Sequence, residues 1–205
     1  KTTPPTAGEL IRRQRQETSL AVSQPSARER MLADTLRRYP TFERLGTAYS
    51  ASLQGLLLSS PEKAYSDKSP AIGDLGRMYH AEAPALWVET QLQTLDFASQ
   101  TKESADQSAL TEFSTLFAAQ YPGIKLTEFL LFIARFKLGR YGKFYGYFDT
   151  LTVGEAFRKF LRERAGELDV LERKRLNQQR EDRDRQPVKR DYVFSDFIRK
   201  KLNIK

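Results

Sequence analysis

The segment 140–148 contains the residue types best suited to binding another molecule. Its sequence, RYGKFYGYF, combines five aromatic side chains with Arg140 and Lys143, and glycines lie within it and just before it. Arg and Lys hold phosphate groups, and aromatic faces stack on bases for about 1–3 kcal/mol each. Glycine lets the backbone approach a ligand closely. The segment is therefore predicted to contact nucleic acid.

The same segment also has a purely structural interpretation. Gly139 suits a left-handed helix C-cap, and Tyr and Phe in a turn can pack on the two helices that it joins. The two roles are compatible if the Phe side chains anchor the turn while Arg140, Lys143 and Tyr145 point outward. The string resembles the RNA-recognition-motif signature, but that motif lies on a strand and this one lies between two helices, so we reject that fold. The residues predicted to contact nucleic acid are Arg135, Lys137, Arg140, Tyr141, Lys143, Tyr145, Arg158 and Arg162.

Known catalytic patterns do not occur in the sequence. There is no cysteine, and the single histidine, His80, rules out a histidine-pair metal site. Gly142-Lys143 is followed by Phe144 instead of the Ser or Thr of a phosphate-binding loop. The carboxylates at 163 and 167 have Arg or Lys neighbours at helical spacing, which is typical of surface ion pairs. We therefore predict a non-enzyme with no catalytic residues, no metal site and no cofactor.

The net charge of +8 is distributed unevenly. Residues 135–205 have twenty Lys and Arg against eleven Asp and Glu, whereas residues 46–134 have five against ten. A basic third beside an acidic middle favours a polyanionic partner or an acidic protein surface. A solvated, Arg-rich helix is the alternative, because the cations are mixed with Asp and Glu.

Apolar residues recur at helical spacing along most of the chain. Helices are expected over 26–38, 41–59, 72–80, 84–99, 109–121, 128–138 and 152–185. The predicted fold is all-α: a multi-helix orthogonal bundle around a central helical hairpin, 128–138 with 153–171, and a charged projecting C-terminal helix. Capping boxes are expected at Ser26 and Thr152, and Thr127 is expected to cap the most apolar helix. Leu86, Phe97 and Leu116 are expected among the inward side chains.

Three regions are predicted. Residues 1–25 form a flexible basic arm, 26–171 a helical core domain, and 172–205 a charged helix or linker followed by a short amphipathic helix. No apolar run is long enough for a membrane span or a signal peptide, so we expect a cytoplasmic protein. Leu171 and Leu176 are too sparse for a long zipper. The residues predicted to bind a protein partner lie on the last helix: Phe194, Phe197, Ile198 and Leu202.

The stretch LTEFLLFIARFKLGRYGKFYG at 126–146, continuing to FLRER at 160–164, is similar to an uncharacterised family of small helical proteins from phages and mobile elements of Bacteroides-type bacteria. The similarity is strongest over 85–170. It implies a helical fold and a mobile-element setting with a role in replication, and it transfers no activity or site residue. The predicted function is a non-enzymatic nucleic-acid-associated accessory protein that binds DNA or RNA. The alternative is a protein–protein adaptor or assembly component without nucleic-acid contact.

Overall fold

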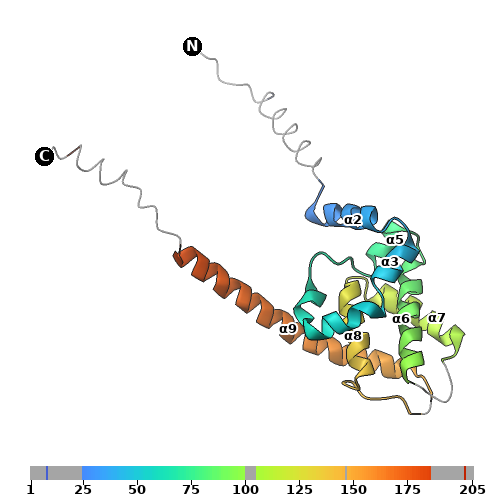
Figure 1. The fold of residues 1–205 in the computed structure, drawn as a ribbon. Coiled ribbons are helices and arrows are strands. Elements are labelled where there is room, and N and C mark those ends of the chain that lie inside the picture. Colours follow the sequence, from blue (N-terminus) through green and yellow to red (C-terminus); the bar gives the residue numbers. More distant parts are fainter. Residues whose placement is uncertain (1–7, 9–24, 100–104, 146, 186–200, 202–205) are drawn as a thin grey trace. The chain divides into compact units, whose positions relative to one another are not determined.

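The computed structural model describes residues 8, 25–99, 105–145, 147–185 and 201, and the regular elements in these ranges are helices (Figure 1). The all-α prediction is confirmed. An isolated antiparallel bridge joins Ala71 to Lys125. The helices are α2 (Ala27–Arg38), α3 (Phe42–Ala48), the 3-10 helix η1 (Ala51–Leu53), α4 (Gln54–Ser59), the 3-10 helix η2 (Pro61–Tyr65), α5 (Asp74–Met78), α6 (Ala83–Ser99), α7 (Gln107–Gln120), α8 (Leu126–Lys137) and α9 (Thr150–Arg185).

The described chain divides into two compact units after Leu161, within α9. The first unit contains α2 to α8 and the start of α9, and the second contains the rest of α9. The predicted region boundaries at 25/26 and 171/172 stay predictions. None of the helices in the described ranges is long and apolar enough to cross a membrane.

The central helix of the first unit is α8. Every residue from Leu126 to Phe136 is buried, and α4 and α6 pack against the helix (Figure 1). A helix that is apolar nearly all round must be covered on all sides. The prediction that this helix lies at the core is therefore confirmed.

Aromatic rings join α8 to α7 and to the start of α9. The Phe132 and Phe157 ring centroids lie 5.1 Å apart edge to face, and the Phe129 and Phe117 centroids also lie 5.1 Å apart. Such pairs contribute about 0.5–1.5 kcal/mol each beyond the burial of their area. Because Phe157 and Phe160 are fully buried, the predicted packing of α8 against the start of α9 is confirmed.

The start of α8 differs from the prediction. Lys125 occupies the N-cap position, and its backbone N–H donates to Glu128 Oε2 at 3.1 Å. Thr127 lies inside the helix, where its hydroxyl donates to the carbonyl oxygen of Ala64 at 2.7 Å. The predicted Thr127 cap is wrong, because this buried hydroxyl instead connects α8 to η2.

The other two predicted caps have opposite outcomes. At α2 the capping box is confirmed, since the Glu29 N–H donates to Ser26 Oγ at 3.2 Å and the Ser26 N–H donates to Glu29 Oε2 at 2.6 Å. The box predicted from Thr152 is wrong. Asp149 lies before α9 and accepts hydrogen bonds from the Thr152 backbone N–H at 3.1 Å and from its hydroxyl at 2.7 Å.

The predicted single helix over 41–59 is also wrong. After α3, the Ser50 side chain accepts a hydrogen bond from the Ser52 N–H and starts η1. The interruption leaves the Tyr49 carbonyl oxygen to accept a hydrogen bond from Trp87 Nε1 at 3.2 Å. A buried indole usually finds such a partner, so the break in the helix meets a requirement of α6.

Three side chains predicted to face inward are exposed: Leu86 on α6, Phe97 on α6 and Leu116 on α7. Phe97 is the extreme case at 89% exposure. Trp87 on the same helix is buried. The neighbouring helices therefore cover a narrower stripe than the sequence pattern indicates.

Candidate nucleic-acid interface

The aromatic turn, residues 139–148, begins where α8 ends. Gly139 has φ +77° and Gly142 has φ +114°, a region that side-chain-bearing residues rarely adopt. The Gly139 N–H donates to the Phe136 carbonyl oxygen at 2.7 Å, and the Arg140 N–H donates to the Arg135 carbonyl oxygen at 3.1 Å. This pair of bonds is the Schellman motif. The interpretation of Gly139 as a left-handed helix cap is therefore confirmed.

Three rings of the turn pack against the core. Tyr141 is buried and stacks on Phe132, with ring centroids 5.7 Å apart. Phe144 stacks on Phe136 at 5.1 Å, and Phe148 is buried against Phe144 at 4.7 Å. These rings fix the turn to the first unit, as its structural interpretation requires.

The other large side chains of the turn face solvent. Tyr145 is 80% exposed and Tyr147 is 59% exposed. Arg140 and Lys143 are exposed as well. The Lys143 ammonium lies 5.5 Å from the Tyr145 ring centroid, within the range of a cation–π contact. The turn therefore presents two aromatic faces and two cations to the solvent, and its ten residues include no Asp or Glu.

The start of α9 adds cations near the turn. Lys159 Nζ donates to the Tyr141 carbonyl oxygen at 3.5 Å, which brings this helix against the turn. Arg158 is exposed on the same part of α9. Arg162 is exposed too, but it belongs to the second unit. Among the predicted contacts, the structure therefore brings Arg140, Lys143, Tyr145 and Arg158 to the surface of the first unit.

Two predicted contacts on α8 are partly or fully covered. Arg135 is buried, and its guanidinium carbon lies 5.9 Å from the Phe160 ring centroid. Lys137 Nζ donates to Gln54 Oε1 at 3.3 Å and to Thr94 Oγ1 at 3.2 Å, and burial lowers the pKa of this lysine. Both cations extend between neighbouring helices, because α8 is covered on all sides. Together with the buried Tyr141, they are unsuited to contact a ligand on the surface.

An apolar groove of about 280 Å³ lies between α7 and the start of α9. Leu116 and Leu151 line it, and Leu151 is 78% exposed. Arg158 also lines the groove. Sequence reasoning assigned Leu116 to the core and gave Leu151 no role, so it missed this surface.

The remaining predicted residues add no chemistry that the structure describes. His80 is exposed, with Nδ1 3.3 Å from Glu82 Oε2. Within the described ranges, no group of three or more His, Asp or Glu side chains could hold a metal ion. The four residues predicted to bind a protein partner lie outside the described residues: Phe194, Phe197, Ile198 and Leu202.

A family model described as Family of unknown function (DUF6633) matches residues 105–201. The match includes α7, α8, the aromatic turn and α9. This part of the chain is therefore similar to an uncharacterised family, whose description gives no activity. The chain matches no curated protein and no solved structure.

Proposed function

We propose that this chain is a non-enzymatic nucleic-acid-associated accessory protein of a phage or mobile element, acting in replication in the cytoplasm. The aromatic turn contacts the strand, with little base specificity. One observation carries the proposal: the turn buries Tyr141 and Phe148 but leaves Tyr145 and Tyr147 mostly exposed beside Lys143. The mobile-element setting rests on the similarity of residues 85–170 to the family of small helical proteins from phages and mobile elements.

The exposed rings favour single-stranded over double-stranded nucleic acid. Tyr145 and Tyr147 expose large apolar faces, and covering such area gains about 25 cal/mol per Å². An unpaired base can stack on a ring, whereas the bases of a duplex are already stacked on each other. Single strands are therefore the expected ligand.

Exposed cations of the turn and of the start of α9 supply the attraction to phosphate. Lys143 and Arg158 are exposed, and neither forms an ion pair within the part of the chain that the structure describes. A phosphate that replaces the solvent around them releases counterions, so affinity must fall with salt. These contacts go to the backbone of the strand and give little sequence preference.

Fluorescence anisotropy with labelled single- and double-stranded DNA and RNA tests the proposal. We expect micromolar or tighter binding of single strands at about 50 mM salt, which weakens steeply as salt is raised. K143Q/Y145A should weaken it at least roughly tenfold, because a phosphate contact and a stacked base are lost. K174Q/L176A removes one lysine and one exposed apolar side chain from α9 and should change it less than about twofold. Absence of binding by all four nucleic acids at low salt would contradict the proposal.

A protein–protein adaptor is the second candidate, and the apolar groove favours it. Leu116 and Leu151 expose apolar surface on both helices that form the groove. L116S/L151S should then abolish capture of a protein partner that the unmodified chain captures. K143Q/Y145A should leave that capture intact. Capture that is lost on deletion of residues 187–205 but kept by L116S/L151S would assign the contact to the predicted C-terminal helix and not to the groove. Equal capture by the chain and by L116S/L151S would exclude a role for the groove.

A further inference from the structure

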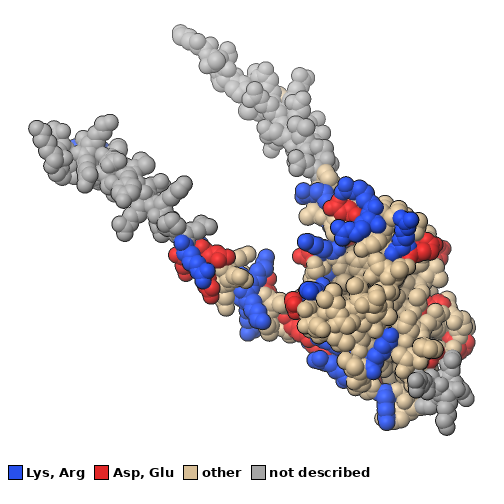
Figure 2. Space-filling view, viewed as in Figure 1, with Lys and Arg blue, Asp and Glu red and all other residues tan. Residues whose placement is uncertain are grey.

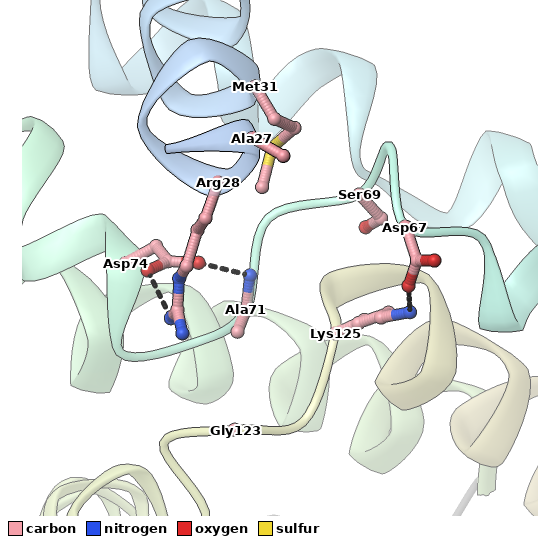
Figure 3. Close-up of a pocket in the computed structure, with 9 residues that line it drawn as sticks. All are labelled: Ala27, Arg28, Met31, Asp67, Ser69, Ala71, Asp74, Gly123 and Lys125. Atoms are coloured by element: carbon pink, nitrogen blue, oxygen red, sulfur yellow. Dashed lines mark hydrogen bonds and ion pairs between the residues drawn. The ribbon is translucent and has the colours of Figure 1, made fainter. Parts of the chain in front are cut away.

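Two cavities adjoin α2, and they differ in how their charges are satisfied. The first, of about 410 Å³, lies between α2 and the loop 67–71 (Figure 3). Arg28 pairs with the buried Asp74 at 2.6 Å, and Lys125 pairs with Asp67 at 2.8 Å. Each charged side chain that lines this cavity therefore has its counter-ion within the protein.

The second cavity, of about 640 Å³, is lined by cations that pair with no acid among the described residues. Arg30 and Arg38 of α2 and Lys68 of the loop 67–71 line it. None of the three forms an ion pair within the described part of the chain. The single carboxylate in the lining, Asp34, is already paired with Arg37, which lies outside the cavity. Figure 2 shows basic side chains gathered over α2. An anion in this cavity would meet three cations that have no ion-pair partner among the described residues.

The same cavity has an aromatic wall. Tyr39 and Tyr49 meet edge to face with ring centroids 6.0 Å apart, and both are half-buried. The Tyr49 hydroxyl adds no negative charge near pH 7, because its ordinary pKa of 10.0 already keeps it neutral there and burial raises that pKa further. Thr35 is buried beside them. The cavity thus combines a cationic side with flat apolar rings.

We propose that this second cavity binds a nucleoside phosphate. Arg30, Arg38 and Lys68 hold the phosphate, because charge-assisted hydrogen bonds to phosphate are the strongest that these side chains make. The two tyrosine rings pack against the base. The volume lies in the range of small-molecule sites, about 300–1,000 Å³. A free nucleotide and the 5′-phosphorylated end of a strand share this chemistry.

The cavity and the aromatic turn are separate sites. The lining of the cavity comes from α2, Tyr39, Tyr49 and Lys68, and it includes no residue of 139–148. The inference therefore does not rest on the function proposed for the turn, and each can fail alone.

Isothermal titration calorimetry of the full chain with adenosine monophosphate tests the proposal. Binding should be at least roughly tenfold tighter than that of inorganic phosphate or adenosine, because only the nucleotide engages both cations and rings. R30Q/R38Q should weaken it at least roughly tenfold. R44Q/R77Q removes two exposed arginines of the same unit that line neither cavity, and should change it less than about twofold.

Two further variants test the rings and the cations of the cavity separately. Y39L should weaken binding of the nucleotide and leave that of inorganic phosphate unchanged. K68Q repeats the charge test from the loop if the double variant of α2 fails to fold. Inorganic phosphate that binds as tightly as adenosine monophosphate would overturn the proposal, and so would the absence of nucleotide binding.

A competition experiment distinguishes a free nucleotide from the 5′-phosphorylated end of a strand as the source of the phosphate. A 5′-phosphorylated oligonucleotide that displaces the nucleotide, when its unphosphorylated form does not, identifies a strand end. If neither form displaces the nucleotide, a free nucleotide is the ligand. K143Q/Y145A should leave nucleotide binding unchanged, so failure of strand binding at the turn is distinguishable from failure of this cavity.

Discussion

The aromatic turn and residues 172–185 of α9 both belong to the basic third of the sequence, but they present their charge differently. The turn has exposed cations and no acidic residue. On α9, Arg173 pairs with Asp169 at 2.6 Å, and Arg175 pairs with Glu172 at 2.8 Å. The Arg175 guanidinium also lowers the pKa of the Glu172 carboxyl. Figure 2 shows cations and acids alternating along this helix.

Net charge and anion affinity are therefore separate properties. Cations that have acids within one helical turn stabilise their own helix by about 0.2–0.5 kcal/mol per pair, and a phosphate must compete with those acids. Cations on the turn have no such competitor in their own segment. Aromatic anchoring also differs, because the turn is fixed by buried rings whereas every residue of 172–185 is exposed.

The largest expected effect concerns stability. F157A should lower the free energy of unfolding by about 3–5 kcal/mol, because it removes a buried ring between α7 and α8. L176A, on the exposed part of α9, should change it by less than about 0.5 kcal/mol. Urea unfolding followed by the fluorescence of Trp87, which is buried in the first unit, measures both. Equal urea midpoints for F157A and L176A would contradict the assignment of Phe157 to the core.

The next effect separates local from net charge. K143E/R158E and R173E/R175E change the net charge by the same amount. The first should weaken binding of a single strand by roughly tenfold to a hundredfold, and the second by less than about threefold. Anisotropy at one fixed salt concentration compares them. Equal losses would mean that overall charge, and not the turn, attracts the strand.

Local features of the site follow from the sequence, whereas exposure depends on distant contacts. The Gly139 cap is predictable because only neighbouring residues determine it. Arg135 has the residue type and helix position of a surface cation, yet Phe160, far along the chain, covers it. Tyr141 and Tyr145 are the same residue type and have similar neighbours in the sequence. Tyr141 is nevertheless buried and Tyr145 exposed, and the positive φ of Gly142 redirects the backbone between them.

The cavity beside α2 could not be predicted for a related reason. Its cations come from α2 and from Lys68, about thirty residues later, and its rings are Tyr39 and Tyr49. The residues of α2 by themselves indicate only a capped helix. Tyr49 lies where the helix predicted over 41–59 breaks, and the spacing of apolar residues did not indicate that break.

The smallest expected effect depends on pH and compares two carboxylates, Asp149 directly after the turn and Glu172 on α9. Hydrogen bonds from Thr152 lower the pKa of Asp149. D149A should cost about 1 kcal/mol at pH 7, the usual loss for an N-cap. Since the folded pKa lies below the ordinary value of 3.8, the unfolded chain binds the proton first. The stabilisation by Asp149 is therefore complete above pH 3.8 and is lost as pH falls through the folded pKa.

Urea midpoints of the chain and D149A should accordingly differ at pH 7 and converge in acid. E172Q is the matched control, because the pKa of Glu172 is also lowered but by Arg175 on the exposed part of α9. Solvent screens that pair, so the Trp87 midpoint of E172Q should follow that of the unmodified chain at every pH. A gap between the chain and D149A that stays constant into acid would show that the Asp149 carboxylate does not cap α9 through its charge, and the anchoring of the turn would then rest on its buried rings alone.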